Sequence, residues 1–210
     1  MKRIAILFLV SVLIGGCGSI LPSGPAPDLF YLTPKSTFNA DLPEVKWQLV
    51  IEEPVAGGGL DTSSIALHPN PTEVKYFADA RWTERAPKMI QTLLVESFEN
   101  SGTITAVGRE AIGLRADYSL KTELREFQAE YFNGTESAPS VRVRINAKII
   151  KQPRQIIVAS RNFEQVFKVN GNTEMLSIIK VFDSALGKVM KDLVEWTLIS
   201  TEAVENAESS

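Results

Sequence analysis

The strongest constraint on the fold is a pair of segments in which apolar and polar residues alternate. Between 141 and 149 every second residue is apolar, and the residues between them are Arg, Asn or Lys. Residues 117–125 alternate in the same way. A period of two is that of a β-strand with one buried and one solvated face. Because the turn signal Asn133-Gly134-Thr135 lies between them, the two segments predict a large β-hairpin.

Shorter runs of apolar and β-branched residues predict further strands. Their predicted bounds are 29–33, 47–53, 103–107 and 156–169. Residues 65–77 are interrupted by His68-Pro69-Asn70-Pro71, so they are predicted to be two short strands around a rigid tip. The tip is expected at an edge or in solvent, because proline cannot donate to a sheet ladder.

Two segments have helical spacing instead. Residues 83–100 carry one apolar stripe, with Thr83 as a candidate N-cap and Gly102 just past the end. Residues 173–200 carry a longer apolar stripe, with charged residues elsewhere on the helix. Gly187 lies inside this second helix at a cost of about 1 kcal/mol relative to alanine, which indicates a close approach or a bend.

The order of these elements predicts the fold class. One helix comes mid-chain and one comes last, around runs of strand, which is typical of an α+β domain. We expect a largely antiparallel sheet with two helices packed on one face. Residues 28–200 form a single domain in this prediction, and the acidic residues 201–210 form a disordered tail.

The N-terminus has the pattern of an export signal. Lys2 and Arg3 precede the apolar segment 4–14, which at about 1.5 Å per residue reaches roughly half of a ~30 Å hydrocarbon core. Leu13-Ile14-Gly15-Gly16-Cys17 then resembles the bacterial lipobox, with Ile14 where leucine is commoner. We therefore predict that residues 1–16 are a signal peptide and that Cys17 is lipidated. The alternative is an ordinary signal peptide followed by a stray cysteine.

The single cysteine supports lipidation. Cys17 is the only cysteine of 210 residues, so an intrachain disulfide is excluded and the thiol needs another use. Residues 17–27 are rich in Gly, Pro and Ser and are predicted to be the lipidated cysteine and a flexible tether, extending about 30 Å. Gly18 follows the cysteine where aspartate would retain a lipoprotein at the inner membrane. The expected location is the periplasmic face of the outer membrane.

The charge balance excludes a nucleic-acid partner. The chain has 22 Lys and Arg against 25 Asp and Glu, and removal of Lys2 and Arg3 makes the mature chain more acidic still. Such a chain has no basic footprint for nucleic acid or for anionic headgroups. Membrane attachment is therefore expected from the acyl chains alone.

The sequence offers no catalytic, metal or cofactor site. His68 is the only histidine and lies in the predicted loop tip, and Cys17 is used by acylation. The spacings of zinc ligands are missing. Gly57-Gly58-Gly59 lacks the Lys-Ser/Thr of a phosphate loop. We expect no enzyme activity, no metal and no cofactor.

Candidate partner-binding residues lie on the strand before the first helix. Arg81 and Trp82 are the first candidates, because Trp and Arg are over-represented at interface hot spots. Tyr76 and Phe77 are also candidates, since alternation places one of them outside the core. For Trp82 the alternative is that it fills the core beside the first helix while Arg81 pairs with an acid.

Several short motifs, in this order and spacing, resemble the ABC-type transport auxiliary lipoproteins, the PqiC-like family. The resemblance covers roughly residues 17–200. Besides the lipobox, the motifs are Phe30-Tyr31-Leu32-Thr33-Pro34, the stretch 76–82, Phe98-Glu99-Asn100-Ser101-Gly102, Ala116-Asp117-Tyr118-Ser119-Leu120 and Ala185-Leu186-Gly187 with Trp196.

The resemblance implies a role in transport. Members of this family accompany MCE-domain proteins and ABC transporters that move lipids or other hydrophobic molecules between the two membranes. It implies a non-catalytic outer-membrane terminus that docks the periplasmic MCE-domain protein, and homo-oligomerisation is plausible beside a symmetric assembly. The alternative is a structural or assembly lipoprotein, such as a secretion pilot or envelope scaffold, with a similar small domain.

Overall fold

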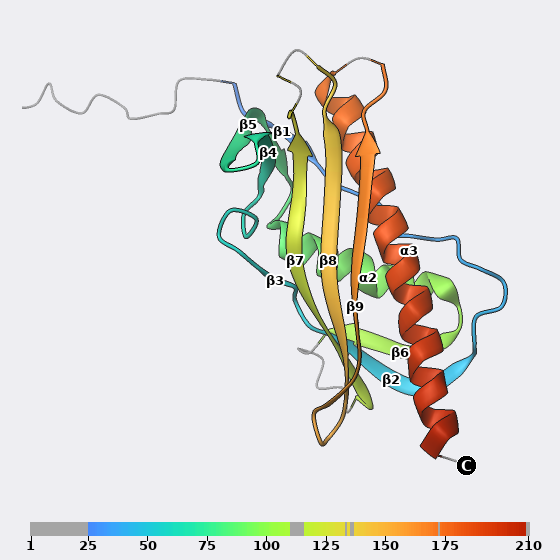
Figure 1. Ribbon diagram of the computed structural model, residues 1–210. Helices are drawn as coiled ribbons and strands as arrows, with labels where there is room; N and C mark the ends of the chain where they lie inside the picture. The colour runs from blue at the N-terminus through green and yellow to red at the C-terminus, as the bar shows by residue number, and fades with distance from the viewer. Residues whose placement is uncertain (1–24, 110–115, 133, 135–136, 172, 209–210) are drawn as a thin grey trace, which may run out of the picture.

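The computed structural model describes residues 25–109, 116–132, 134, 137–171 and 173–208, and in these the chain forms one mixed sheet and two helices (Figure 1). The predicted signal peptide, Cys17, most of the tether and most of the Asn133-Gly134-Thr135 turn lie outside the described residues. The elements are β1 (Asp28–Phe30), β2 (Val45–Ile51), β3 (Val55–Ala56), β4 (Ser64–Asn70), β5 (Glu73–Trp82), α2 (Ala86–Ser101), β6 (Ile104–Arg109), β7 (Tyr118–Glu130), β8 (Ser140–Lys151), β9 (Ile156–Lys168) and α3 (Met175–Glu208).

Three long antiparallel strands, β7, β8 and β9, form the longest ladders of the sheet, with β8 between β7 and the edge strand β9. The predicted hairpin is confirmed, with Leu124 opposite Ile145 and Leu120 opposite Ile149. Because β8 pairs with β7 along its whole length, β2, β3 and β4 pair in succession with the other edge of β7, and they do so in parallel. The sheet is therefore mixed and mostly antiparallel, and the α+β class is confirmed.

The alternation along β8 separates core from surface. Its apolar residues are fully buried and belong to one core cluster with α2 and α3, while the Arg residues between them lie on the opposite face and are only half-buried. The fully buried residues of β8 are Val141, Val143, Ile145, Ala147 and Ile149. Helix α3 packs against β8 and β9 and also contacts α2. The period of two thus decides which face the helices cover.

The first helix ends as predicted but begins later. Gly102 terminates α2 in the left-handed conformation, at φ 67°, with its N–H donating to the carbonyl of Glu99. The predicted N-cap, Thr83, is wrong: the N-cap is Arg85, and its side chain makes no capping hydrogen bond. The N–H of Thr83 instead donates to the carbonyl of Phe30 at 2.9 Å, because the chain here still extends the β1–β5 ladder.

The tip between β4 and β5 is shorter than predicted. His68 and Pro69 belong to β4, which runs to Asn70, and β5 begins at Glu73. Pro69 is tolerated because it falls where the register of the β4–β5 ladder shifts, and the β4–β7 ladder ends at His68. The amide oxygen of Asn70 accepts from the N–H of Thr72 at 3.1 Å and closes the turn.

The predicted disordered tail is wrong for residues 201–208, which continue α3 to Glu208. The acidic side chains there have partners on the sheet: Tyr118 donates to Glu205, and the Lys151 ammonium bonds Glu205 at 3.0 Å and Glu208. Acidic composition alone indicated a solvated tail, but these contacts order it. No helix among the described residues is long and apolar enough to span a membrane.

We expect the end of α3 to loosen in acid. Hydrogen bonds from the Tyr118 hydroxyl and the Lys151 ammonium lower the pKa of Glu205 below its usual range. The stabilisation is therefore present above the unfolded pKa of about 4.3 and is lost as the pH falls through the lower folded pKa. Since the groups are partly exposed, the effect is at most about 1 kcal/mol. Amide hydrogen exchange of residues 201–208 at pH 3 and pH 6, corrected for intrinsic rates, measures it.

Glu205→Gln should remove most of this pH dependence. Glu174→Gln, an exposed change before the other end of α3, is the control and should leave it intact. Equal protection of residues 201–208 at both pH values in the native chain would contradict the role assigned to Glu205.

Gly187→Ala should stabilise the protein by about 0.5–1 kcal/mol and raise Tm by roughly 1–4 °C. The expected close approach at Gly187 is wrong: a Cβ built there meets nothing within 4 Å. The change therefore lowers the backbone entropy of the unfolded chain without a steric cost. Thermal unfolding followed by circular dichroism measures it. Gly102→Ala is the matched control and should destabilise the protein, because Gly102 has a positive φ. A lower Tm for Gly187→Ala would contradict the conclusion that a Cβ fits there without a clash.

Candidate functional site

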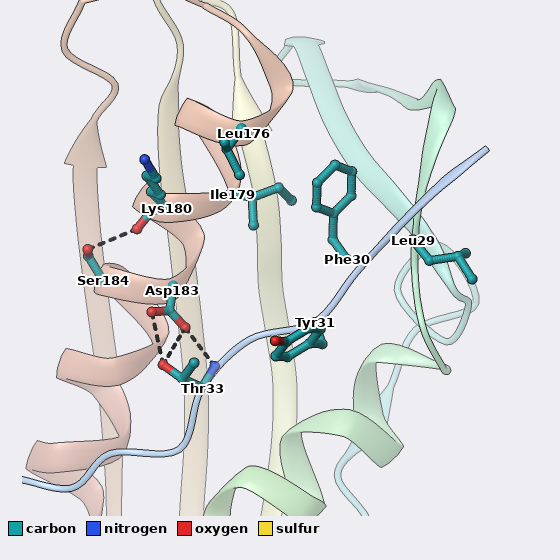
Figure 2. A pocket seen from close by; sticks show the side chains of 9 residues that line it. All are labelled: Leu29, Phe30, Tyr31, Thr33, Leu176, Ile179, Lys180, Asp183 and Ser184. Atoms are coloured by element: carbon teal, nitrogen blue, oxygen red, sulfur yellow. Dashed lines mark hydrogen bonds between the residues drawn. The ribbon is translucent and has the colours of Figure 1, made fainter.

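An apolar groove at the surface lies between the start of the described chain and the start of α3 (Figure 2). It has a volume of about 440 Å³. The strand β1 and the residues that follow it form one wall, and the first turns of α3 form the other. Its lining residues are Leu29, Phe30, Tyr31, Thr33, Leu176, Ile179, Lys180, Asp183 and Ser184.

Strand alternation places apolar side chains on both sides of β1 and its extension. In Figure 2, Phe30 projects toward Leu176 and Ile179, while Leu29 projects away from them. Leu32 is buried in the core, whereas Leu29 is 64% and Tyr31 72% exposed. A strand with large apolar residues on both faces normally lies inside a protein. Here one of the two faces is left open.

A polar latch fixes this wall of the groove to α3. The backbone N–H of Thr33 donates to the carboxylate of Asp183 at 2.7 Å, and the Thr33 hydroxyl donates to both carboxylate oxygens at 3.0 Å. The latch joins residues 150 positions apart in the sequence. It holds residues 29–33 against α3 and so preserves the groove.

A second groove continues along α3 on the far side of the latch. It has a volume of about 490 Å³ and shares Thr33, Asp183 and Ser184 with the first. Its outer part carries Lys188, which pairs with Asp192, and Lys191, whose ammonium donates to Asn39 at 3.1 Å. The two grooves thus form one track that is apolar near β1 and polar farther along α3.

The structure resolves the two readings of Trp82 in favour of the core. Trp82 is 2% exposed, and its ring centroid lies 5.3 Å from those of Phe127 and Phe182. Its place as a candidate partner-binding residue is therefore corrected: no partner surface can reach the indole without unfolding the core. Strand β5 is paired with β1 and β4 at this point, which buries the side chain between sheet and helix.

The other three candidates lie closer to the surface. Tyr76 is 42% exposed, and its hydroxyl donates to the carbonyl of Gly59 at 3.1 Å. Phe77 is half-buried, with its ring 6.5 Å from that of Tyr131. Arg81 is half-buried and donates to the hydroxyl of Ser64 at 2.6 Å, so the expected pairing with an acid is replaced by a neutral acceptor. As partner-binding residues these three stay a prediction.

The open face of the sheet carries a network of ion pairs. The Arg142 guanidinium bonds Glu130 at 2.7 Å and also pairs with Glu126 and Glu164. The hydrogen bond to Glu130 is the main cause that raises the pKa of Arg142 above its usual value. Arg144 bonds Glu126 at 2.9 Å. These charges are matched within the sheet face, and no group of three or more His, Cys, Asp or Glu suited to a metal ion occurs among the described residues.

Sequence reasoning missed the groove. Residues 29–33 were predicted only as a strand, and the exposed apolar residues of α3 could not be separated from its long stripe. The available signal was the run Leu29-Phe30-Tyr31-Leu32, which is apolar on both faces. In such a strand one face packs on the core, and the other is either covered by another part of the protein or available to bind a partner.

Comparison with known proteins gives the relationships of the chain. Residues 30–194 match the model of the family described as ABC-type transport auxiliary lipoprotein component. The crystal structure of a protein from Xanthomonas campestris is 31% identical, with a TM-score of 0.79, and the match covers 85% of this chain and 99% of that chain. A second crystal structure, of an uncharacterized protein, has a TM-score of 0.64 at 12% identity over 81% of this chain and 97% of that one, which shows a likeness of fold alone.

A curated relative extends the comparison in sequence. An uncharacterized protein of Bradyrhizobium diazoefficiens is 31% identical over 155 residues, which are 72% of this chain but 40% of the relative. The chain thus spans about two fifths of that relative's length. The family match, by contrast, reaches from the end of β1 into the second half of α3, and it includes every other element between them. On this evidence the chain belongs to the family of ABC-type transport auxiliary lipoprotein components.

Proposed function

We propose that this protein is the non-catalytic, outer-membrane terminus of an MCE-type ABC transport system that moves lipids or other hydrophobic molecules across the envelope. The observation that carries the transport role is the family match over residues 30–194. The motifs that resemble the PqiC-like proteins support the MCE partner and the hydrophobic cargo. Gly18 after the lipidated Cys17 supports the outer membrane.

The fold suits a docking component. The core is closed by α2 and α3 on one face of the sheet, while the opposite face and β5 remain accessible. Arg142 and Lys151 have pKa values raised above the usual range, and each is paired with a glutamate, Glu130 and Glu205 respectively. Their arrangement supports a structural role for these charges. Ring-like self-association would suit contact with a symmetric MCE assembly, and the mass of the solubilised native lipoprotein tests it.

Site-specific photocrosslinking in the native envelope tests the partner. A photoreactive residue is placed singly at Tyr76, Arg81 and Lys148, which sample β5 and the outer face of the sheet. We expect at least one of these positions to capture an MCE-domain protein. The same residue at the buried position Leu186 is the control and should capture only this chain.

The outcome separates the two functional classes. Capture of a secretion or envelope-scaffold protein at these positions, with no MCE-domain protein, would replace the transport role by the structural one. Absence of any MCE-domain protein from all three captures, and from affinity capture of the mildly solubilised lipoprotein, would also make the proposed role wrong.

Gly18→Asp should move the protein to the inner membrane. Aspartate after the acylated cysteine is the retention signal in the Gram-negative sorting scheme, so the acyl anchor persists while its destination changes. Density-gradient separation of the two membranes measures the shift, which we expect for most of the protein. Gly18→Ser keeps a small neutral residue and is the matched control. An unchanged distribution for Gly18→Asp would argue against sorting to the outer membrane.

A further inference from the structure

We propose that Leu29, Tyr31 and Leu176, named here the apolar patch, rest on the surface of the bilayer that holds the acylated Cys17. The inference depends on the lipid anchor of the proposed function, but not on the MCE partner. It assigns a second membrane contact to the domain itself. Such a contact fixes the orientation of the domain relative to the membrane.

The three large side chains of the apolar patch are each more than half exposed to solvent. Leu29, Tyr31 and Leu176 are 64%, 72% and 56% exposed, although they line one groove. They come from two segments about 145 residues apart, β1 with its extension and the first turn of α3 (Figure 2). Single exposed apolar residues are ordinary. Here Leu29 and Tyr31 lie on one wall of a groove and Leu176 lies on the other, and several large apolar residues exposed around one groove mark an interaction surface.

The short chain between Cys17 and the apolar patch indicates that the bilayer is what the patch contacts. Leu29 is the twelfth residue after Cys17, and at 3.3–3.6 Å per residue the segment between them spans about 40 Å and at most about 43 Å. The acyl chains therefore hold the bilayer within about 40 Å of Leu29, wherever the domain turns. Contact costs little additional chain entropy, because the tether already supplies a high effective concentration of membrane.

The chemistry of the patch fits an interface between lipid and water. Tyrosine has an apolar ring and a polar hydroxyl and is enriched at the headgroup level of membranes. Beside it, the Lys180 ammonium makes no ion pair among the residues that the structure describes and can reach phosphate oxygens. The nearby Asp183 carboxylate is already occupied by Thr33. Leucine side chains at 29 and 176 supply the apolar area.

The position of the patch implies an orientation. In Figure 1 the start of α3 and the entry of the chain lie at the end of the molecule opposite the C terminus. Helix α3 has 34 residues and is about 50 Å long. If the patch touches the bilayer, α3 leads away from it, and Glu208 lies toward the periplasm.

Tryptophan quenching by brominated lipids tests the contact. The acylated full-length lipoprotein is reconstituted into vesicles of phosphatidylethanolamine and phosphatidylglycerol with brominated acyl chains. Tyr31→Trp and Leu176→Trp introduce the probe in the patch. Ile199→Trp is the matched control, since Ile199 is 54% exposed on the same helix and lies 23 residues, or about 35 Å, beyond Leu176. The native chain gives the background from Trp47, Trp82 and Trp196.

We expect the added fluorescence of Tyr31→Trp and Leu176→Trp to be quenched at least about twofold more than that of Ile199→Trp, because interfacial groups reach the acyl boundary. Equal quenching at all three positions, or none, overturns the patch. Failure of the protein to float with vesicles overturns the anchor and the patch together. If no MCE-domain protein is captured but the quenching is preserved, only the transport role is wrong. The two proposals can therefore fail separately.

Discussion

We expect Cys17→Ala to abolish acylation and, once the signal peptide is also removed, to move the protein from the membrane fraction to the soluble periplasmic fraction; this is the largest effect that we expect from a change at one residue. A buried acyl chain contributes about 0.8 kcal/mol per CH₂, so one long chain outweighs all other contacts of the domain with a bilayer. The patch offers three side chains of about 1.5–3 kcal/mol each when fully buried, and at an interface less. Fractionation and incorporation of labelled palmitate measure the two effects.

The control for Cys17→Ala must remove the signal peptide. An uncleaved residue 4–14 segment would itself hold the precursor at a membrane, since it is almost wholly apolar. The chain from Gly18 onward is therefore also exported behind a signal peptide that an ordinary signal peptidase removes. We expect this form to be soluble. Firm membrane attachment of this cleaved, unacylated form would contradict the argument that lipid supplies the anchor.

Trp82→Ala should destabilise the fold by about 3–5 kcal/mol, the usual cost of a large aromatic truncation in a core. Trp82 packs against Phe127 of β7 and Phe182 of α3, and these two rings also contact each other at 5.1 Å. Removal of the indole opens a cavity where the sheet meets the helix. We expect Tm to fall by roughly 6–20 °C in thermal unfolding, at 2–4 °C per kcal/mol.

A neighbouring change separates stability from binding. Arg81→Ala removes one hydrogen bond to Ser64 and should alter the free energy of unfolding by about 1 kcal/mol. If Arg81 belongs to a partner surface, this variant stays folded but loses the crosslink. An unchanged Tm for Trp82→Ala, together with loss of the partner, would restore Trp82 as a binding residue and make the core assignment wrong.

The elements that the sequence predicted well are those with long, unambiguous periods. The alternation at 141–149 predicts a strand because only a period of two buries every one of its apolar residues. Gly102 ends α2 as expected, since a left-handed residue is a local requirement that glycine meets. The predicted start of α2 at Thr83 was wrong, because the N–H of Thr83 bonds the carbonyl of Phe30, more than fifty residues away, and extends a strand ladder.

The acidic end of α3 shows why composition misled the prediction. Residues 201–210 look like a solvated tail when judged alone. In the structure Lys151, at the end of β8, faces Glu205 and Glu208, and Tyr118 completes the cluster. Nothing local marks these pairings. They exist because α3 packs along β8 and β9, which brings its last turns beside Lys151.

The family and the α+β class of this protein could be predicted from local sequence patterns. The strand and helix periods are long, regular patterns that repeat along a whole element, so they predict that element before its tertiary contacts are known. Which side chains are available for contact depends on how distant segments pack together. Trp82 is buried in the core, whereas Leu29, Tyr31 and Leu176 line one exposed groove. Both outcomes arise because the pairing of β1 with β5 and the packing of α3 join segments that are distant in the sequence.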